Sequence, residues 1–160
     1  MVFGCRELGR ISTYATAARE QGLRIGMAAT FGDLLHRGHL DLLEAASELC
    51  DTLIVDMGDD AECRRSKGPG RPVIAEGDRV AIVHALACVD HVVLMDSAVR
   101  KEAAIAAALP DSYVRGGEYT PGRFPEAAIM ARIGGRCIVH GRPDREHTTA
   151  IIARIKGLPR

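Results

Sequence analysis

The feature that most constrains the fold is a regular alternation of short apolar runs with amphipathic segments. Runs typical of buried strands occupy residues 23–29, 51–58, 90–95, 111–116 and 136–140. Helical patterns occupy residues 12–22, 38–50, 75–89, 99–110, 125–135 and 148–157, whereas 59–74 begins as a short helical turn and becomes a loop. Strands alternating with helices of about 10–15 residues indicate βαβ units. We therefore expect a single doubly wound α/β domain, in which a five-stranded parallel sheet carries helices on both faces.

Composition narrows the class of protein further. The chain has 160 residues, 47% hydrophobic but only 4% aromatic, so we expect one domain with an aliphatic core. Its net charge of zero argues against a nucleic-acid partner. No apolar run approaches the roughly 20 residues that span a bilayer, and the first residues lack the apolar core of a signal peptide. The five cysteines form no CxxC pair, which is typical of a reducing, cytoplasmic location.

Two histidines mark the stretch TFGDLLHRGHLDLL, residues 30–43. The first predicted strand ends before it, and a predicted helix begins at Gly38. His36 and His39 thus lie at a helix N-terminus, where unpaired N–H groups favour an anion such as phosphate. Gly38 lets a ligand approach the backbone closely. Two imidazole donors at this place would stabilise negative charge that develops on a phosphoryl group, so the stretch favours phosphoryl or nucleotidyl transfer.

The histidine pair has two other interpretations. It could begin a helix without binding any ligand, or it could bind a metal ion, since residues three apart share one helix face. Only Asp33 offers a third ligand nearby, so we predict no protein-held metal site. Asp33 itself could orient a histidine or cap the helix, and the sequence does not separate these roles.

The stretch DLLHRGH, residues 33–39, resembles the HxGH signature of the nucleotidyltransferase superfamily that includes the cytidylyltransferases. Further stretches resemble that family in the same order: SKGPGRPV (66–73), EGDRVAIVHALACVDHVV (76–93), LPDSYVRGGEY (109–119) and RPDREHTTAII (142–152). The resemblance spans residues 24–157 and implies a Rossmann-like domain over residues 1–157. We interpret residues 158–160 as the start of a linker to a second domain.

The resemblance implies an enzyme that transfers a nucleoside monophosphate from a triphosphate to a phosphate-bearing acceptor and releases pyrophosphate. It also implies Mg²⁺ held mainly through the nucleotide phosphates, and a homodimer. By resemblance, His36, His39, Lys67 and Arg79 are catalytic, and Asp33 joins Lys67 and Arg79 in binding the acceptor. The residues implied in nucleotide binding are Thr30, Phe31, Gly38, Arg115, Gly116, Gly117, Glu118, Tyr119, Arg142, His147, Thr148 and Thr149.

The base and the acceptor are less defined by these motifs. The family usually has Gly-x-Phe-Asp where this chain has Thr30 to Asp33, with Gly32 in place of the phenylalanine, so the acceptor is in doubt. RPDREHTT is similar to the cytidylyltransferase motif, and we favour CTP. VRGGEY instead resembles the heptose-phosphate adenylyltransferases, which use ATP. The whole chain also looks similar to the cytidylyltransferase part of the fused enzyme of fosfomycin biosynthesis, which suggests 2-hydroxyethylphosphonate as the acceptor. A glycerol-3-phosphate-type cytidylyltransferase is a further alternative.

Other functions remain compatible with the same residues. A nucleotide-binding sensor would use this pocket without turnover, and a hydrolase or metal enzyme could use the histidine pair. Lys67 and Arg79 could be solvated charges, and the glycine pair at 116–117 could form only a turn. We assign His84, His91 and His140 to structural or surface positions.

Overall fold

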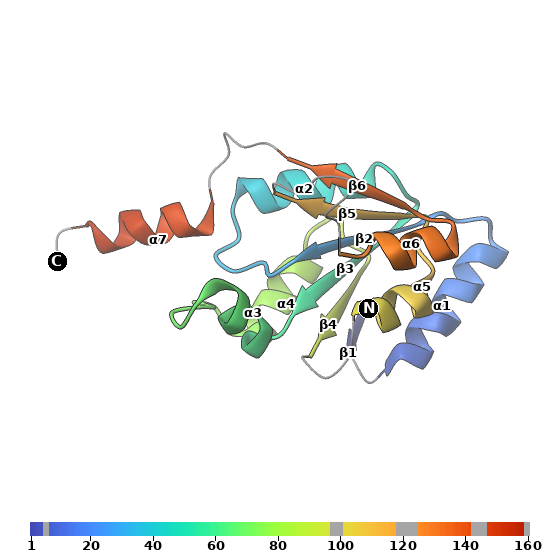
Figure 1. Ribbon diagram of the computed structural model, residues 1–160, viewed down its shortest axis with the longest axis horizontal. Coiled ribbons are helices and arrows are strands. Elements are labelled where there is room, and N and C mark those ends of the chain that lie inside the picture. The colour runs from blue at the N-terminus through green and yellow to red at the C-terminus, as the bar shows by residue number, and fades with distance from the viewer. Residues whose placement is uncertain (5–6, 97–100, 118–124, 142–146, 159–160) are drawn as a thin grey trace.

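The computed structural model describes residues 1–4, 7–96, 101–117, 125–141 and 147–158. They form one sheet of six parallel strands in the order β1-β4-β3-β2-β5-β6 (Figure 1). The strands are β1 (Val2–Gly4), β2 (Ile25–Thr30), β3 (Thr52–Gly58), β4 (His91–Met95), β5 (Ser112–Gly116) and β6 (Arg136–His140). The parallel, doubly wound architecture predicted from the alternating pattern is confirmed.

Helices cover both faces of this sheet. They are α1 (Leu8–Glu20), α2 (Arg37–Ser47), α3 (Asp60–Lys67), α4 (Glu76–His84), α5 (Lys101–Ala108), α6 (Ala127–Ile133) and α7 (Thr148–Lys156). Buried side chains of α1, α5 and α6 pack on one face, and those of α2 and α4 pack on the other. The last helix, α7, projects away from the sheet and has no buried residue (Figure 1).

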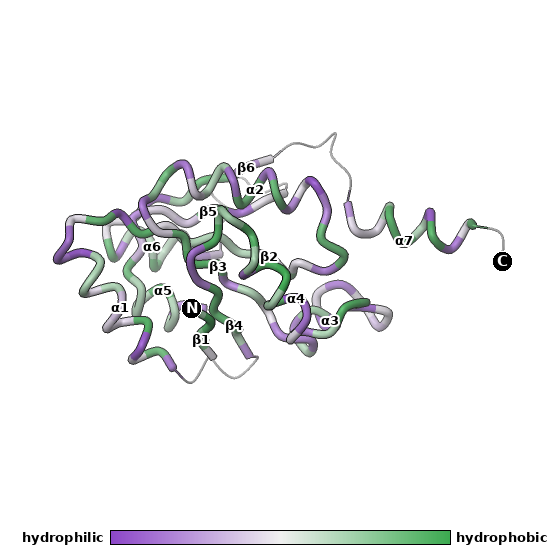
Figure 2. Tube along the Cα trace, turned by 180° about the vertical axis from the view of Figure 1, so that it is seen from behind, coloured by the Kyte–Doolittle hydropathy of each residue, from purple (hydrophilic) through white to green (hydrophobic). Residues whose placement is uncertain are grey.

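The strands form because apolar residues occupy both of their faces. All seven residues of β3 are buried, as expected for a central strand of a parallel sheet. Side chains alternate along a strand, so Ile54 joins the α1 side of the core and Leu53 joins the α2 side. Figure 2 shows apolar residues gathered along the central strands and polar ones on the outer turns of the helices. Most of the core is aliphatic, as the composition predicts.

The expected number of strands was wrong, because the sheet has six strands rather than five. The additional strand β1 pairs with β4, Val2 beside Val92, and it buries Phe3 to 1% exposure. Three residues are too few to show an alternating pattern, so the sequence gives no periodic signal for such an edge strand. The first helix also starts earlier than predicted, at Leu8, and the predicted turn after β3 is the full helix α3, capped by Asp59.

The order in which the chain adds strands to the sheet reverses beside β2, although all strands run parallel. Chain order runs from β2 outward through β3 to β4, and then returns past them to β5 on the opposite side of β2. Ligands of such sheets bind where the strand order reverses, beyond the carboxyl ends of the strands. The segments after Thr30, Gly58 and Gly116 therefore define the place where a site is expected.

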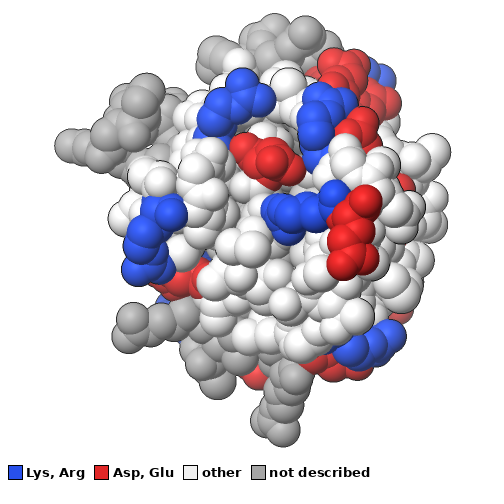
Figure 3. All heavy atoms as spheres, turned by 90° about the vertical axis from the view of Figure 1, so that its right-hand side faces the viewer, with Lys and Arg blue, Asp and Glu red and all other residues white. Residues whose placement is uncertain are grey.

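The outer surface carries no single sign of charge on the face shown in Figure 3, where basic and acidic side chains are interspersed. This agrees with the net charge of zero. Within the described part of the chain, no helix has the length and apolar character needed to cross a bilayer.

Candidate active site

A cavity of about 770 Å³ opens at the carboxyl edge of the sheet. It lies at the reversal of strand order, and its walls come from the ends of β2, β5 and β6 and from the starts of α2 and α7. The residues predicted from sequence that line it are Thr30, Phe31, Asp33, His36, Gly38, His39, Lys67, Arg115, Gly116, Gly117, His147, Thr148 and Thr149. Segments more than 100 residues apart thus contribute to one pocket.

The histidine pair stands at the N-terminus of α2, as predicted. His36 is the N-cap residue, and its Nδ1 accepts a hydrogen bond of 3.1 Å from the backbone N–H of Gly38. The rings of His36 and His39 lie 3.9 Å apart between centroids, tilted by 32°. Because Nδ1 of His36 acts as an acceptor, the proton of the neutral ring is on Nε2. Capping therefore sets the tautomer of His36.

Burial controls the charge of the second histidine. Burial, with the adjacent His36 as the next cause, lowers the pKa of His39 to about 4. His39 is therefore neutral near pH 7, and its Nδ1 is buried without a hydrogen-bond partner among the described residues. A neutral imidazole offers one N–H donor to a ligand, and a bound polyanion would favour its protonation. The pair is thus suited to stabilising charge that develops on a phosphoryl group.

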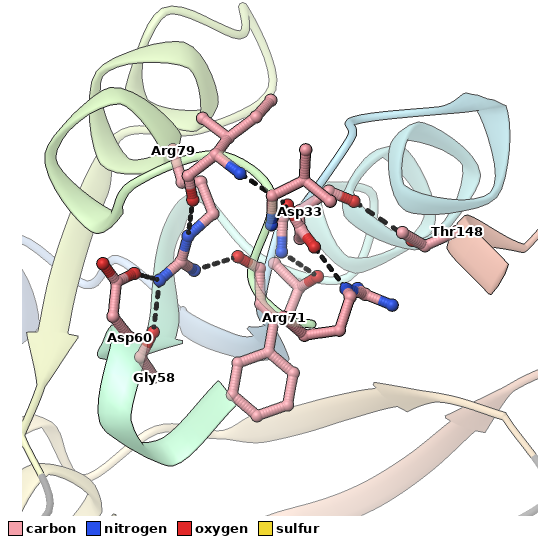
Figure 4. Close-up of polar contacts among 11 residues, drawn as sticks. Asp33, Gly58, Asp60, Arg71, Arg79 and Thr148 are labelled. Carbon is pink, nitrogen blue, oxygen red and sulfur yellow. Dashed lines mark hydrogen bonds and ion pairs between the residues drawn. The ribbon is translucent and has the colours of Figure 1, made fainter. Parts of the chain in front are cut away.

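Asp33 holds the loop before α4 against the site. Its carboxylate is 1% exposed and accepts hydrogen bonds from the guanidinium of Arg71 and from the backbone N–H groups of Val73 and Ile74 (Figure 4). Burial alone would raise the pKa of Asp33, but these donors hold it below its ordinary value. Asp33 lines the cavity, so the predicted acceptor contact through this carboxylate stays a prediction, although protein donors already bind both of its oxygens.

Arg79 is another residue predicted to bind the acceptor. Its side chain is fully buried at 0% exposure. The guanidinium donates to the carbonyl oxygens of Phe31, Gly58 and Ile74 and pairs with Asp60 at 2.8 Å (Figure 4). The structure does not bring Arg79 into the cavity wall, because its guanidinium binds the segments that follow β2 and β3 and precede α4. Its predicted direct contact with substrates stays a prediction.

Lys67 remains in the pocket wall, at the end of α3. Its Nζ lies 5.9 Å from the centroid of the Phe31 ring. That ring in turn packs over Gly58, where a Cβ atom would come within 2.6 Å of it. Glycine at the end of β3 thus makes room for Phe31, and Phe31 lies under the ammonium group of Lys67.

The structure also explains why the altered motif has a glycine at the neighbouring position, Gly32. Its φ of +64° lies in the left-handed region, and an added Cβ would meet Met57 and Val83 at 3.0 Å. A phenylalanine side chain is therefore excluded at this position by both backbone conformation and space.

The opposite wall comes from the ends of β5 and β6. Arg115 pairs with the buried Glu126 at 3.0 Å, and Gly117 has a φ of +106° that a side chain would strain. Gly116 and Gly117 leave this wall open to close approach, which suits a flat base. Glu118, Tyr119 and Arg142, also predicted to bind the nucleotide, lie outside the described residues.

The start of α7 closes the cavity. His147 is its N-cap residue, and Thr148 and Thr149 form its first turn. The hydroxyl of Thr148 donates a 3.0 Å hydrogen bond to the backbone carbonyl of Asp33, across 115 residues of chain (Figure 4). This contact holds the N-terminus of α7 beside that of α2, so two helix N-termini border the same cavity. Such an arrangement favours a polyanionic ligand.

The pocket also contains residues that the sequence did not single out. The polar ones are Arg71, Lys101, Asp41 and His140, and the others are Ala29, Leu42, Gly58 and Gly141. Arg71 lies within the basic Gly/Pro loop and was overlooked beside Lys67. His140 ends the predicted strand 136–140, so its place at a strand's carboxyl edge was the available signal, whereas Lys101 lies within the predicted helix 99–110 and had no such signal. We had assigned His140 to a structural or surface position, and the structure places it in the cavity wall.

Comparison with known proteins assigns the class. A family model described as cytidylyltransferase-like matches residues 29–154. The match covers most of the chain and includes every described wall of the cavity. The chain belongs to the cytidylyltransferase-like family of HxGH nucleotidyltransferases, which the motifs predicted.

Two curated relatives are similar over most of the chain. Bifunctional protein HldE of Streptomyces coelicolor is 41% identical over 143 residues, which is 88% of this chain and 30% of that protein. Bifunctional protein HldE of Syntrophotalea carbinolica is 42% identical over 123 residues, or 77% of this chain and 25% of that protein. The chain thus spans less than a third of the length of these relatives.

Two solved structures share the fold. A lipopolysaccharide core biosynthesis protein from Thermoplasma volcanium superposes with a TM-score of 0.65 at 24% identity, over 76% of this chain and 99% of that one. A pantoate-beta-alanine ligase from Francisella tularensis gives a TM-score of 0.58 at 12% identity, over 95% and 71%. At these identities the likeness concerns the fold alone.

The relatives correct one expectation. The resemblance to the cytidylyltransferase of fosfomycin biosynthesis is not supported, because the relatives found are HldE proteins. CTP and 2-hydroxyethylphosphonate therefore lose their support as the favoured substrates.

Proposed function

We propose that this chain transfers AMP from ATP to a heptose 1-phosphate and releases pyrophosphate. The observation that carries the transfer chemistry is the cavity in which the histidine pair, Lys67 and the first turn of α7 converge. The choice of substrates rests on two supports: the similarity to HldE proteins and the VRGGEY stretch, which resembles heptose-phosphate adenylyltransferases.

The size of the cavity supports a two-substrate reaction. At about 770 Å³ it lies in the upper part of the range of about 300–1,000 Å³ for ligand sites. The helix N-termini of α2 and α7 would bind the triphosphate, and Gly116 and Gly117 would border the base. Lys67, on the other side, would bind phosphate oxygens.

The reaction needs positioning and charge stabilisation more than covalent help from the protein. An oxygen of the acceptor phosphate attacks the α-phosphorus in line, a new P–O bond forms, and the bond to the β-phosphate oxygen breaks. The electron pair of that bond leaves with pyrophosphate. His36 and His39 would donate hydrogen bonds to the α-phosphoryl oxygens as their charge grows.

In the proposed reaction, Mg²⁺ binds together with the nucleotide triphosphate. Among the residues that the structure describes, no three His, Cys, Asp or Glu side chains group as a metal site. The residues therefore fit Mg²⁺ that is coordinated mainly by triphosphate oxygens, where it would neutralise the charge of the leaving pyrophosphate. The family resemblance also implies a homodimer, which stays a prediction that the molar mass in solution decides.

The test is pyrophosphate release with Mg²⁺, in which ATP and CTP are each combined with heptose 1-phosphate, glycerol 3-phosphate and 2-hydroxyethylphosphonate. We expect release with ATP and heptose 1-phosphate, and its loss in His39→Asn. His84→Asn, outside the cavity, is the matched control and should keep the wild-type rate.

Release with CTP would keep the mechanism and replace the proposed base. Tight binding of nucleotide without release from any pair would contradict the enzyme and favour a sensor.

A further inference from the structure

A lysine that the transfer mechanism does not use faces the cavity from the acceptor side. Lys101 is the first described residue of α5, and it lines the cavity. Its Nζ lies 3.8 Å from Oδ2 of Asp56 and 3.9 Å from Oε1 of Glu62. The side chains of Lys101 and Glu62 are 24% and 23% exposed, and that of Asp56 is 1% exposed. One ammonium group therefore lies between two carboxylates at the edge of the pocket.

Asp56 is held rigidly behind this lysine. The hydroxyl of Tyr113 donates a 2.8 Å hydrogen bond to Oδ2 of Asp56, while Oδ1 is buried without a hydrogen-bond partner among the described residues. Burial, and then the nearby Asp56, raises the pKa of Tyr113 well above its ordinary value, so its hydroxyl stays a donor. A carboxylate buried this deeply requires a nearby cation, which Lys101 provides.

The two lysines of the pocket differ in the charged groups around them. Lys101 faces two carboxylates, so this cluster carries a formal charge of about −1. The ion pairs among the described residues leave Lys67 without a carboxylate within 4.0 Å, and it lies over the Phe31 ring. A phosphate dianion is attracted to the uncompensated charge of Lys67. At Lys101 the same dianion would meet two carboxylates as well.

The ammonium group of Lys101 nevertheless keeps its donors. Distances of 3.8 and 3.9 Å are longer than hydrogen bonds, so its three N–H groups are not committed to Asp56 and Glu62. A charge-compensated donor of this kind suits neutral oxygen acceptors, and a sugar supplies these as hydroxyl groups.

We infer that Lys101 is a specificity residue that binds hydroxyl groups of a sugar acceptor, and that Asp56 and Glu62 make it unsuited to phosphate. The inference rests on the proposed function and deepens it. It assigns the acceptor a polyhydroxylated body, with its phosphate near Lys67 and its hydroxyl groups near Lys101. Short alkyl phosphates and phosphonates would leave this lysine without a ligand.

The test measures binding and needs no turnover. Calorimetry with a non-hydrolysable ATP analogue present gives the Kd of mannose 1-phosphate, as a sugar-phosphate probe, and of inorganic phosphate. In Lys101→Met we expect the Kd of the sugar phosphate to rise about tenfold, the loss of one charged-donor hydrogen bond, and that of phosphate to stay within about twofold. Lys67→Met should weaken both probes. Lys156→Met, at the exposed end of α7, is the control and should change neither.

Lys101→Met removes the partner of a buried carboxylate, so a second variant guards against misfolding. Glu62→Gln is a mild change of a partly exposed side chain that removes one of the two compensating charges. It should tighten the binding of inorganic phosphate about threefold, because the formal charge of the cluster around Lys101 then rises from about −1 to about 0 and repels the dianion less.

Equal weakening of both probes in Lys101→Met would overturn the inference, since Lys101 would then bind phosphate. Unchanged phosphate binding in Glu62→Gln would also overturn it. Failure of the proposed function would look different: the wild-type protein would release no pyrophosphate from ATP and heptose 1-phosphate, whatever these binding constants are.

Discussion

At the residue scale, the protonation of each imidazole decides what the site can do. The N–H of Gly38 fixes the tautomer of His36, and burial keeps His39 neutral at physiological pH. The free protein therefore has two neutral donors where a permanent pair of cations would repel. The imidazoles would gain positive charge only when an anionic ligand binds beside them. The empty pocket therefore does not hold two like charges in a partly desolvated place.

His36 has a structural and a chemical role that substitution can separate. His36→Asn keeps a side-chain acceptor at the N-cap, whereas His36→Ala removes it. We expect Ala to cost about 1 kcal/mol of unfolding free energy and Asn clearly less. Both should lower kcat by about 100-fold, because each removes a donor to the α-phosphate. Chemical denaturation and steady-state kinetics measure the two effects. A fully active His36→Asn would show that His36 serves only as a cap.

Single residues were predictable where a motif is local. The histidine pair and Gly38 lie within four positions and were found from that spacing. Arg71 and Lys101 reach the same cavity through tertiary packing of separate loops, and nothing in their own neighbourhoods distinguishes them from solvated charges. Arg79 shows the reverse limit, since the sequence pattern of a basic residue on a helix does not reveal that its side chain is fully buried.

At the scale of elements, Arg79 is a connection between loops. From α4 it binds the carbonyl oxygens of Phe31, after β2, and Gly58, at the end of β3, and it pairs with Asp60 in α3. Three segments that carry pocket residues are thereby held by one side chain. Fork-shaped donors make arginine suited to this role, whereas a lysine could satisfy only part of it.

We therefore expect Arg79→Lys to lower the free energy of unfolding by about 3 kcal/mol, since buried acceptors lose their partners. Urea denaturation measures this loss. Arg65→Lys, on the exposed surface of α3, is the matched control and should change stability little. Unchanged stability together with a higher KM would instead support the direct substrate contact that the sequence suggested.

Elements were predictable in proportion to their length. The long central strands and the helices between them carry clear periodicity, so their order and parallel arrangement followed from the sequence. The three residues of β1 carry none, and its existence depends on the open edge of β4. The full helix α3 was predicted only as a turn, because its polar sequence DAECRRSK lacks an apolar stripe and its start depends on capping by Asp59.

At the scale of the whole molecule, the buried His91 and the half-buried His39 couple stability to pH. Burial lowers the pKa of both His39 and His91 to about 4, from an ordinary value of 6.5. The unfolded chain binds protons at these sites before the folded chain does. Stability is therefore complete above about pH 6.5 and declines as the pH falls toward 4.

Guanidinium denaturation at pH 7.5, 6.0 and 5.0 measures this decline. His91→Phe should reduce its slope, because the ring between Tyr14 and Phe3 no longer titrates. The same slope in the variant and the wild type would show that His91 does not contribute. The direction is definite: acidification destabilises the protein.

The order of strands has a consequence for how such a protein can change. The elements that would contact the acceptor, β3, α3 and α5, lie on one side of β2, while β5, β6 and α7 would border the nucleotide from the other side. The central strand β2 thus lies between the two groups of elements that border the cavity. Exchanging residues 52–101 with those of a relative should transplant the choice of sugar and leave the choice of base untouched. New substrates could thus arise one half at a time.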